Sequence, residues 1–293
     1  MANKQKKAKS GKTSTTVILL IVLALLIAAC AAIILHTRSG VRDLDFEYET
    51  YEPVDYSVED GVPVYSDVEK SIFDKSLFKK GSDGRMTYDG KPCAIGVDVS
   101  EFQGDIDWQA VYQDGIRFAY IRAGFRGYGA AGVMVEDENF RTNIKKARKA
   151  GLQVGVYFYS QALTAVEAKE EADFLLRIIS GYEMDLPVMY DWENYGDGMR
   201  TDDVSVQQLT VCATTFCRRM EQYGYQAGVY YNLTDAYERY DLSKLADRYT
   251  WFAQYNVTPD LYYRFDIWQY TDNGTVKGIE GGVDLNAMLI EPK

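Results

Sequence analysis

The distribution of apolar residues divides the chain into three stretches. Residues 17–35 form an unbroken apolar run, VILLIVLALLIAACAAIIL. Residues 36–91 show no sustained period, whereas residues 92–293 alternate short apolar runs with segments of helical spacing. The first run is long enough to cross a bilayer as a helix. We therefore expect a membrane anchor, a spacer and a globular domain.

The globular domain has the pattern of a barrel. Short apolar strands that alternate with helices form a parallel sheet, and here five such units are followed by three strands with little room for helices between them. We predict an α/β fold, a TIM-like eight-stranded barrel with five βα units and three final strands. The predicted strands are 94–100, 118–125, 154–160, 187–193, 226–232, 250–256, 265–271 and 283–288. The predicted helices are 107–115, 137–150, 164–180 and 204–223, with a short piece near 243–248.

The flanks of the apolar run predict its orientation. Lysines before it and acidic residues after it place the N-terminus in the cytoplasm and the bulk of the chain outside the cell. This gives a cytoplasmic tail at 1–16, a single transmembrane helix in the lipid bilayer at 17–35, and an extracellular remainder. Two alternatives are a cleaved signal peptide, whose apolar core has about 7–15 residues, and lipidation at Cys30.

The composition of residues 36–91 predicts an acidic extracellular linker. Within it, residues 42–60 carry eight acidic side chains against one arginine. Like charges in an aperiodic sequence favour an extended, self-repelling chain, which could reach about 180 Å when fully stretched. Apolar residues at 68, 72, 73 and 78 predict a short amphipathic helix within 66–80.

Composition excludes several kinds of chemistry. A net charge of −11 without a basic stripe argues against nucleic acid as a partner. The single histidine, His36, borders the apolar run, so Ser–His or Cys–His catalysis and histidine zinc sites are excluded from the globular domain. We expect no cofactor, no metal and no disulfide framework. The 24 tyrosines suit a surface that stacks on sugar rings, or they simply fill strands.

Four carboxylates lie near predicted strand ends: Asp98, Asp191, Glu193 and Asp284. Barrels carry their chemistry at one end of the strands, and buried unpaired charge is expensive. Crowded carboxylates hold one group protonated while others stay ionised, which is the division of labour that glycoside hydrolysis needs. Each acid alone could instead be a turn or cap residue. Polar and aromatic candidates for substrate binding near the same ends are Arg122, Tyr157, Tyr159, Tyr230, Gln254 and Trp268.

A series of short motifs carries a family resemblance. In this order, GVDVSEFQGDIDW, FAYIRAGF, GVYFYS, PVMYDWEN, GVYYN, WFAQYN, IWQYT and GGVDLN resemble the glycoside hydrolase family 25 lysozymes, the Chalaropsis-type N-acetylmuramidases. The resemblance spans residues 92–293. It implies a flattened (β/α)5(β)3 barrel that cleaves the β-1,4 bond between N-acetylmuramic acid and N-acetylglucosamine in bacterial peptidoglycan.

The resemblance also implies roles for individual residues. Glu193 corresponds to the general acid/base, Asp191 and Asp98 to the other catalytic carboxylates, and Asp284 to the acid of the last strand. It implies retention of anomeric configuration, with assistance by the sugar's acetamido group as one route. Whether Asp98 or Asp191 orients that group stays open. The aromatic candidates and Arg122 would line sugar subsites of a monomeric domain.

Two other functions compete with this one. The same barrel could be a cell-wall glycan-binding module without turnover, although all four acids are present. A chitinase-like enzyme would need a longer DxxDxDxE run on the fourth strand, and VMYDWEN lacks it.

Overall fold

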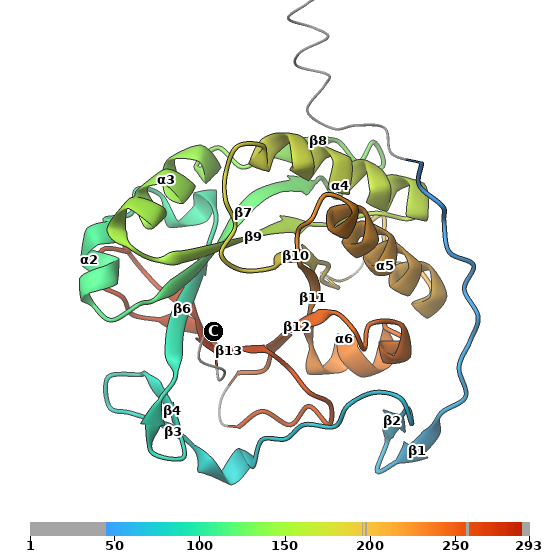
Figure 1. Cartoon of the computed structure of the whole chain (residues 1–293), viewed down its shortest axis with the longest axis horizontal. Coiled ribbons are helices and arrows are strands. Elements are labelled where there is room, and N and C mark those ends of the chain that lie inside the picture. Colours follow the sequence, from blue (N-terminus) through green and yellow to red (C-terminus); the bar gives the residue numbers. More distant parts are fainter. Residues whose placement is uncertain (1–44, 195, 197, 256–257, 289–293) are drawn as a thin grey trace, which may run out of the picture. The chain divides into compact units, whose positions relative to one another are not determined.

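A closed ring of eight strands forms the centre of the described part of the chain (Figure 1). The computed structural model describes residues 45–194, 196, 198–255 and 258–288. Strand β6 pairs with both β14 and β7, which closes the ring. The eight predicted strands are therefore confirmed. Their bounds are β6 (Ala94–Val99), β7 (Phe118–Arg126), β9 (Gln153–Tyr159), β10 (Val188–Asp191), β11 (Ala227–Asn232), β12 (Tyr249–Ala253), β13 (Ile267–Gly274) and β14 (Val283–Met288).

The direction of one strand, β14, differs from the prediction. Strands β6, β7 and β9–β13 pair in parallel, but β14 is antiparallel to both of its neighbours. Only residues 275–282 connect β13 to β14, and a parallel crossover needs a dozen residues or more. The expectation of an all-parallel barrel is thus wrong for the last strand, because a short connection forces the chain to turn back.

The helices lie on the outside of the barrel (Figure 1). Thr164 accepts a hydrogen bond from the backbone of Glu167 at the start of α4, and Gly151 ends α3 in the left-handed conformation with φ 99°. All four predicted helices are present, and a 3-10 turn at Leu242–Lys244 replaces the predicted piece near 243–248. Their bounds are α2 (Trp108–Gln113), α3 (Phe140–Ala150), α4 (Ala165–Ile179) and α5 (Val206–Gln222). Not predicted were α6 (Leu233–Glu238) and β8 (Met134–Glu136), which pairs antiparallel with β7.

Aromatic side chains fill the barrel below its mouth. Tyr120 stacks on Trp251 with ring centroids 4.8 Å apart, and Trp251 also contacts Tyr230 at 4.9 Å. A side chain at Gly96 would collide with the ring of Phe118, so the absence of a Cβ there is what admits the ring. The interior is a packed core, as in other barrels of this kind, and space for a ligand is left at the mouth.

The segment before the barrel is folded where an extended linker was expected. The hydroxyl of Tyr263 accepts from the backbone N–H of Tyr65 at 2.8 Å and donates to the carbonyl of Pro63 at 2.6 Å. Tyr65 and Phe78 are buried, and no helix forms within 66–80 apart from one 3-10 turn at Lys75–Leu77. The strands of this segment are β1 (Ser57–Glu59), β2 (Val62–Val64), β3 (Phe78–Lys80), β4 (Met86–Tyr88) and β5 (Lys91–Pro92).

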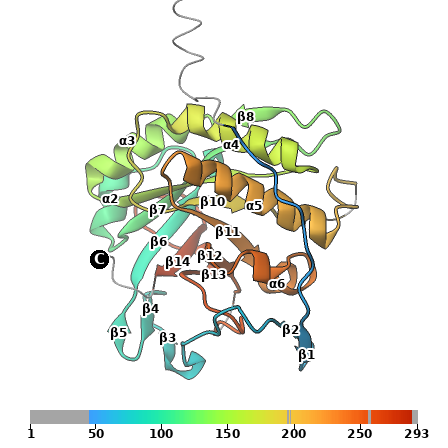
Figure 2. The ribbon, with the colours of Figure 1, turned by 45° about the vertical axis from the view of Figure 1, so that its right-hand side comes forward.

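Residues 45–56 cross the C-terminal part of α5 and lead towards the β1–β2 hairpin (Figure 2). The ring of Phe46 lies 5.6 Å from the guanidinium of Arg218, and Tyr51 donates to Asp241 at 2.8 Å. Aromatic rings therefore hold an acidic segment against the barrel despite its charge. Residues 45–91 consequently belong to the same compact unit as the barrel.

The predicted cytoplasmic tail and transmembrane helix lie outside the described residues, as do residues 36–44 of the predicted linker. Within the part of the chain that the structure describes, no helix has the length and apolar character needed to span a membrane.

The docking of the N-terminal segment can be tested at Tyr263. We expect Tyr263→Phe to lower the free energy of unfolding by about 1–3 kcal/mol, because the buried N–H of Tyr65 loses its acceptor. Chemical denaturation of the full-length chain measures the change. Tyr56→Phe, on a side chain that is 55% exposed, is the matched control and should leave stability unchanged. Equal stability of Tyr263→Phe and the wild type would contradict the docking.

Candidate active site

Four carboxylates meet at the mouth of the barrel. Asp98 on β6 and Asp284 on β14 face each other in the antiparallel register, and Asp191 is the last residue of β10. Together with Glu193, they line a cavity of about 280 Å³. All four predicted acids are therefore in one place, brought there by three different strands.

Successive side chains along a strand point to opposite faces, so Trp192 lies on the other side of the strand from Asp191 and Glu193. Asp191 and Glu193 both line the cavity, whereas Trp192 is 1% exposed and points to the opposite side. There its ring lies 5.0 Å from the guanidinium of Arg239 and meets Tyr240 edge-on at 6.5 Å. Packing of Trp192 thus fixes the direction of the carboxylates on either side of it.

Asp98 is held by two amide side chains. Its Oδ2 accepts from Nε2 of Gln269 at 2.9 Å and from Nδ2 of Asn286 at 2.7 Å. Asn286 is itself oriented by Trp251, whose indole N–H donates to Oδ1 of Asn286 at 2.7 Å. Hydrogen bonds of this kind favour the ionised carboxylate.

Two tyrosines orient the second amide. The hydroxyls of Tyr230 and Tyr255 donate to Oε1 of Gln269 at 3.1 and 2.9 Å. With its oxygen occupied, Gln269 presents its N–H group to Asp98. The side-chain amide of Gln269 thus links the aromatic wall of the cavity to the carboxylate of Asp98.

Burial raises the pKa of each carboxyl, and repulsion between the acids adds to this at Asp191, Glu193 and Asp284. The pKa of Glu193 is raised to about 7, by burial first and then by the charges of Asp98 and Asp235. Burial and the charge of Asp98 raise the pKa of Asp284 to about 9. Asp98 reaches only about 6, because its two amide donors oppose the effect of burial.

Asp191 is the most enclosed of the four acids. Its pKa is raised well above the ordinary value by burial and by the charges of Glu193 and Asp98. Its Oδ1 is buried and has no hydrogen-bond donor among the described residues. Near neutral pH the site therefore contains protonated carboxyls beside one carboxylate, which is the combination that acid-assisted cleavage of a glycosidic bond requires.

Arg122 lines the cavity but does not pair with the four acids. Its Nε donates to Asp137 at 2.9 Å, and its Nη2 lies 3.0 Å from Glu101. The guanidinium also lies 5.0 Å from the ring centres of Phe102 and Phe125. Arg122 thus ties the turn after β6 to the wall of the cavity, while its charge lowers the pKa of Asp191.

The structure divides the predicted binding residues into two groups. Tyr157, Tyr159 and Tyr230 line the cavity, as Arg122 does. Gln254 and Trp268 are not among the described residues that line it. Trp268 packs outside the barrel because its neighbour Gln269 takes the inward position, and strands alternate between the two faces.

Several residues of the cavity were not among the predicted candidates. Phe102 is 78% exposed at the rim, in a 3-10 turn whose capping box joins Ser100 and Gln103. Tyr128 and Tyr255 lie on other parts of the wall. The capping spacing in SEFQ marks the turn that holds Phe102 in place, so this residue could have been found from sequence. The two tyrosines lie on loops, where periodicity gives no signal.

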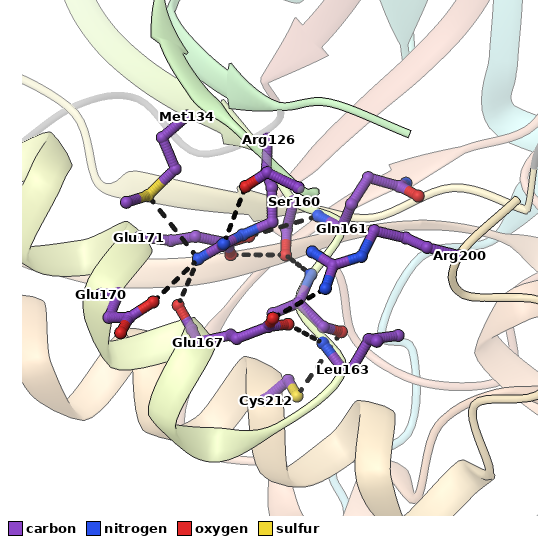
Figure 3. Close-up of polar contacts among 12 residues, drawn as sticks. Arg126, Met134, Ser160, Gln161, Leu163, Glu167, Glu170, Glu171, Arg200 and Cys212 are labelled. Atoms are coloured by element: carbon purple, nitrogen blue, oxygen red, sulfur yellow. Dashed lines mark hydrogen bonds and ion pairs between the residues drawn. The ribbon is translucent and has the colours of Figure 1, made fainter. Parts of the chain in front are cut away.

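A buried ionic network lies beside the loop that follows Glu193 (Figure 3). Arg126 donates to Glu171 at 2.7 Å, and the hydroxyl of Ser160 donates to the other oxygen of Glu171 at 2.6 Å. From the loop itself, Arg200 donates to Glu167 of α4 at 2.7 Å. These contacts attach the loop after the candidate acid to the helix layer.

No set of histidine, cysteine or acidic side chains in the described part of the chain is arranged to hold a metal ion.

Comparison with known proteins agrees with the geometry. The autolytic lysozyme of Clostridium acetobutylicum is 29% identical over 192 residues, covering 65% of this chain and 54% of that protein. Lysozyme M1 of Streptomyces globisporus is 28% identical over 201 residues, covering 65% of this chain and 66% of its own length. The chain thus spans between half and two thirds of the length of these two relatives.

Two solved structures share the barrel. A family 25 glycosyl hydrolase from Bacillus anthracis is 25% identical with a TM-score of 0.58, covering 67% of this chain and 89% of that one. The bacterial lysozyme from Streptomyces coelicolor is 25% identical with a TM-score of 0.55, covering 68% and 93%. The sequence model of glycosyl hydrolases family 25 matches residues 97–279, a stretch that contains Asp98, Asp191 and Glu193. Since this match covers more than half of the chain and includes three of the four acids of the cavity, the chain belongs to glycosyl hydrolases family 25.

Proposed function

We propose that the chain is a peptidoglycan hydrolase, a Chalaropsis-type muramidase that cleaves the β-1,4 bond between N-acetylmuramic acid and N-acetylglucosamine. The observation that carries this proposal is the pKa of about 7 for Glu193, beside an amide-bound Asp98, at the mouth of a family 25 barrel. Its relatives named lysozymes support the same substrate class. The function would be remodelling of the cell wall.

In this proposal Glu193 is the general acid. It donates its proton to the glycosidic oxygen as the bond from that oxygen to the anomeric carbon of muramic acid breaks. Asp98, the acid with two amide donors, stays ionised and stabilises the positive charge that develops on the sugar ring. Water then adds to the anomeric carbon, and the proton that it loses returns to Glu193.

The remaining acids and the aromatic wall bind and orient the substrate. Asp191 is held protonated, so it can donate a hydrogen bond to a carbonyl such as that of the sugar's acetamido group. Tyr157, Tyr159 and Phe102 offer faces on which sugar rings stack. We assign Asp284, with a raised pKa of about 9, as a second neutral donor beside Asp98.

We also propose that residues 17–35 anchor the enzyme in the cell membrane, with the barrel outside the cell. The apolar run and the lysines before it support this placement. Nine residues, 36–44, separate the proposed anchor from Asp45, the first described residue, and nine residues cannot span more than about 30 Å. The enzyme would then act on peptidoglycan close to the bilayer.

The role of Glu193 is tested by Glu193→Gln. We expect kcat on purified peptidoglycan to fall by about 10²–10⁴-fold, because the amide cannot donate the acid's proton. Glu138→Gln, at an exposed site, is the matched control and should keep full activity. Mass spectrometry of the wild-type products should find muramic acid at the new reducing end. A glucosamine end, or full activity of Glu193→Gln, would contradict the proposal.

A stability measurement separates chemistry from folding in the same variant. The pKa of Glu193 is higher in the folded state than in the unfolded state. The wild type therefore loses stability as the pH rises from the ordinary pKa of a glutamate to about 7. Glutamine carries no charge and removes that loss. At pH 8, Glu193→Gln should therefore melt at a temperature equal to or above that of the wild type.

The pH dependence of kcat/KM should be bell-shaped. Activity should rise as Asp98 ionises near pH 6 and fall as Glu193 loses its proton near pH 7. Gln269→Met removes an N–H donor from Asp98 and should move the acidic limb to higher pH, while the basic limb stays in place. An unmoved acidic limb would show that the amide does not set the ionisation of this site.

Membrane anchoring is tested by fractionation of cells. The full-length chain should sediment with membranes and resist extraction by high salt, whereas a chain lacking residues 1–36 should be soluble. Recovery of the full-length chain in the soluble fraction would contradict the anchor.

A further inference from the structure

The short helix α6 carries a buried acid that is not part of the cavity. The carboxylate of Asp235 is on a residue that is 3% exposed, and its Oδ2 accepts from Nδ2 of Asn232 at 2.7 Å. Asn232 caps the helix, since its Oδ1 accepts from the backbone N–H of Asp235 at 2.9 Å. The cap therefore uses the side chain of Asn232, and the carboxylate of Asp235 has other partners.

Contacts from α6 hold the chain on both sides of Glu193. Before Glu193, the ring of Trp192 lies 5.0 Å from the guanidinium of Arg239, the C-cap of α6. After Glu193, the backbone N–H of Asn194 donates a hydrogen bond to the carboxylate of Asp235. The backbone of Glu193 is therefore fixed between two contacts with the same helix.

Asp235 is surrounded by groups that favour its charged form. Burial raises its pKa, and the charge of Glu238 adds to this effect. The amide of Asn232, the charge of Arg239 and the N–H of Asn194 all lower the pKa. Asp235 is thus a buried carboxylate with its own donors. It is not among the described residues that line the cavity, so a substrate in the cavity does not touch it.

Glu193 has charged and titratable neighbours inside and outside the cavity. Among the described residues, those that line the cavity with it are Asp98, Asp191, Asp284, Arg122 and five tyrosines, of which Tyr159, Tyr230 and Tyr255 interact with its charge. After burial, the charges of Asp98 and Asp235 raise the pKa of Glu193. Asp98 loses its charge when it is protonated near pH 6. Asp235 keeps its charge when substrate fills the cavity, because it lies outside.

We propose that Asp235 is a positioning residue for the general acid, acting on Glu193 through the backbone of Asn194 and through its own buried charge. This inference rests on the proposed function, because only then does Glu193 donate a proton. The hydrogen bond to Asn194 fixes the direction in which the Glu193 side chain leaves the backbone. The charge of Asp235 opposes a second negative charge at Glu193, so the acid keeps its proton until the glycosidic oxygen takes it.

The two contributions of Asp235 are separated by substitution. Asp235→Asn removes the charge and keeps an oxygen that accepts from the N–H of Asn194. Asp235→Glu keeps the charge, and Asp235→Ala removes both the charge and the acceptor. The test measures kcat and KM on purified peptidoglycan between pH 5 and pH 9, using full-length protein in detergent.

For Asp235→Asn we expect the basic limb of kcat/KM to move down by about 0.5–1 pH unit, because loss of a neighbouring negative charge lowers the pKa of Glu193. The acidic limb should stay in place, since Asp235 is not among the groups that shift the pKa of Asp98. For Asp235→Glu both limbs should stay in place. At pH 5, where Glu193 is protonated in every variant, Asp235→Ala should lower kcat about tenfold with KM unchanged, since Glu193 loses its fixed direction.

Glu238→Gln removes the same charge from an exposed position on α6 and is the matched control, with both limbs expected at their wild-type positions. An unmoved basic limb in Asp235→Asn, or an equal shift in Glu238→Gln, would overturn the role of the buried charge. Wild-type kcat for Asp235→Ala at pH 5 would overturn the role of the backbone contact. A loss that is equal at every pH in all three Asp235 variants would show that this residue only supports the fold.

Carbon-13 NMR of protein labelled at its glutamate carboxyls measures the charge effect without turnover. The resonance that is absent from Glu193→Gln belongs to Glu193, and its titration midpoint should be lower in Asp235→Asn than in the wild type. A midpoint that does not move contradicts this inference even if the wild type cleaves peptidoglycan. Absence of cleavage by the wild type, together with a midpoint that moves, contradicts the proposed function alone.

Discussion

The antiparallel pairing of β14 with β6 is the constraint on which the site depends. It closes the barrel, and its register sets Asp284 directly opposite Asp98. A parallel last strand would carry Asp284 to the opposite end of the barrel, because this residue lies at the beginning of β14. The reversal therefore brings a fourth carboxyl to the mouth, where burial and repulsion raise its pKa to about 9.

Around these acids, aromatic residues do more than form a wall. Tyr230, Tyr255 and Trp251 orient the amides of Gln269 and Asn286, and those amides keep the pKa of Asp98 below that of its neighbours. Burial raises the pKa of all four carboxyls, but at Asp98 two amide donors oppose it. This difference in environment, rather than a difference in residue type, assigns the acid and the anion of the proposed reaction.

The N-terminal segment extends the barrel on its outer side. Its aromatic residues pack on the barrel and so overcome the repulsion expected from its acidic composition. Residues 45–91 thus belong to the same compact unit as the barrel, although their composition alone suggests a spacer.

The sequence by itself determined the eight strands, the four main helices and the four acids, because strand alternation and helical spacing are local properties of the chain. It placed Asp191 and Glu193 on one side of Trp192 for the same reason. Only the tertiary structure decided the direction of β14, the outward position of Trp268 and the folding of residues 45–91. Each of these depends on contacts between residues far apart in sequence: a connection too short for a crossover, the competition between Trp268 and Gln269 for the interior, and aromatic side chains that find their partners on the finished barrel.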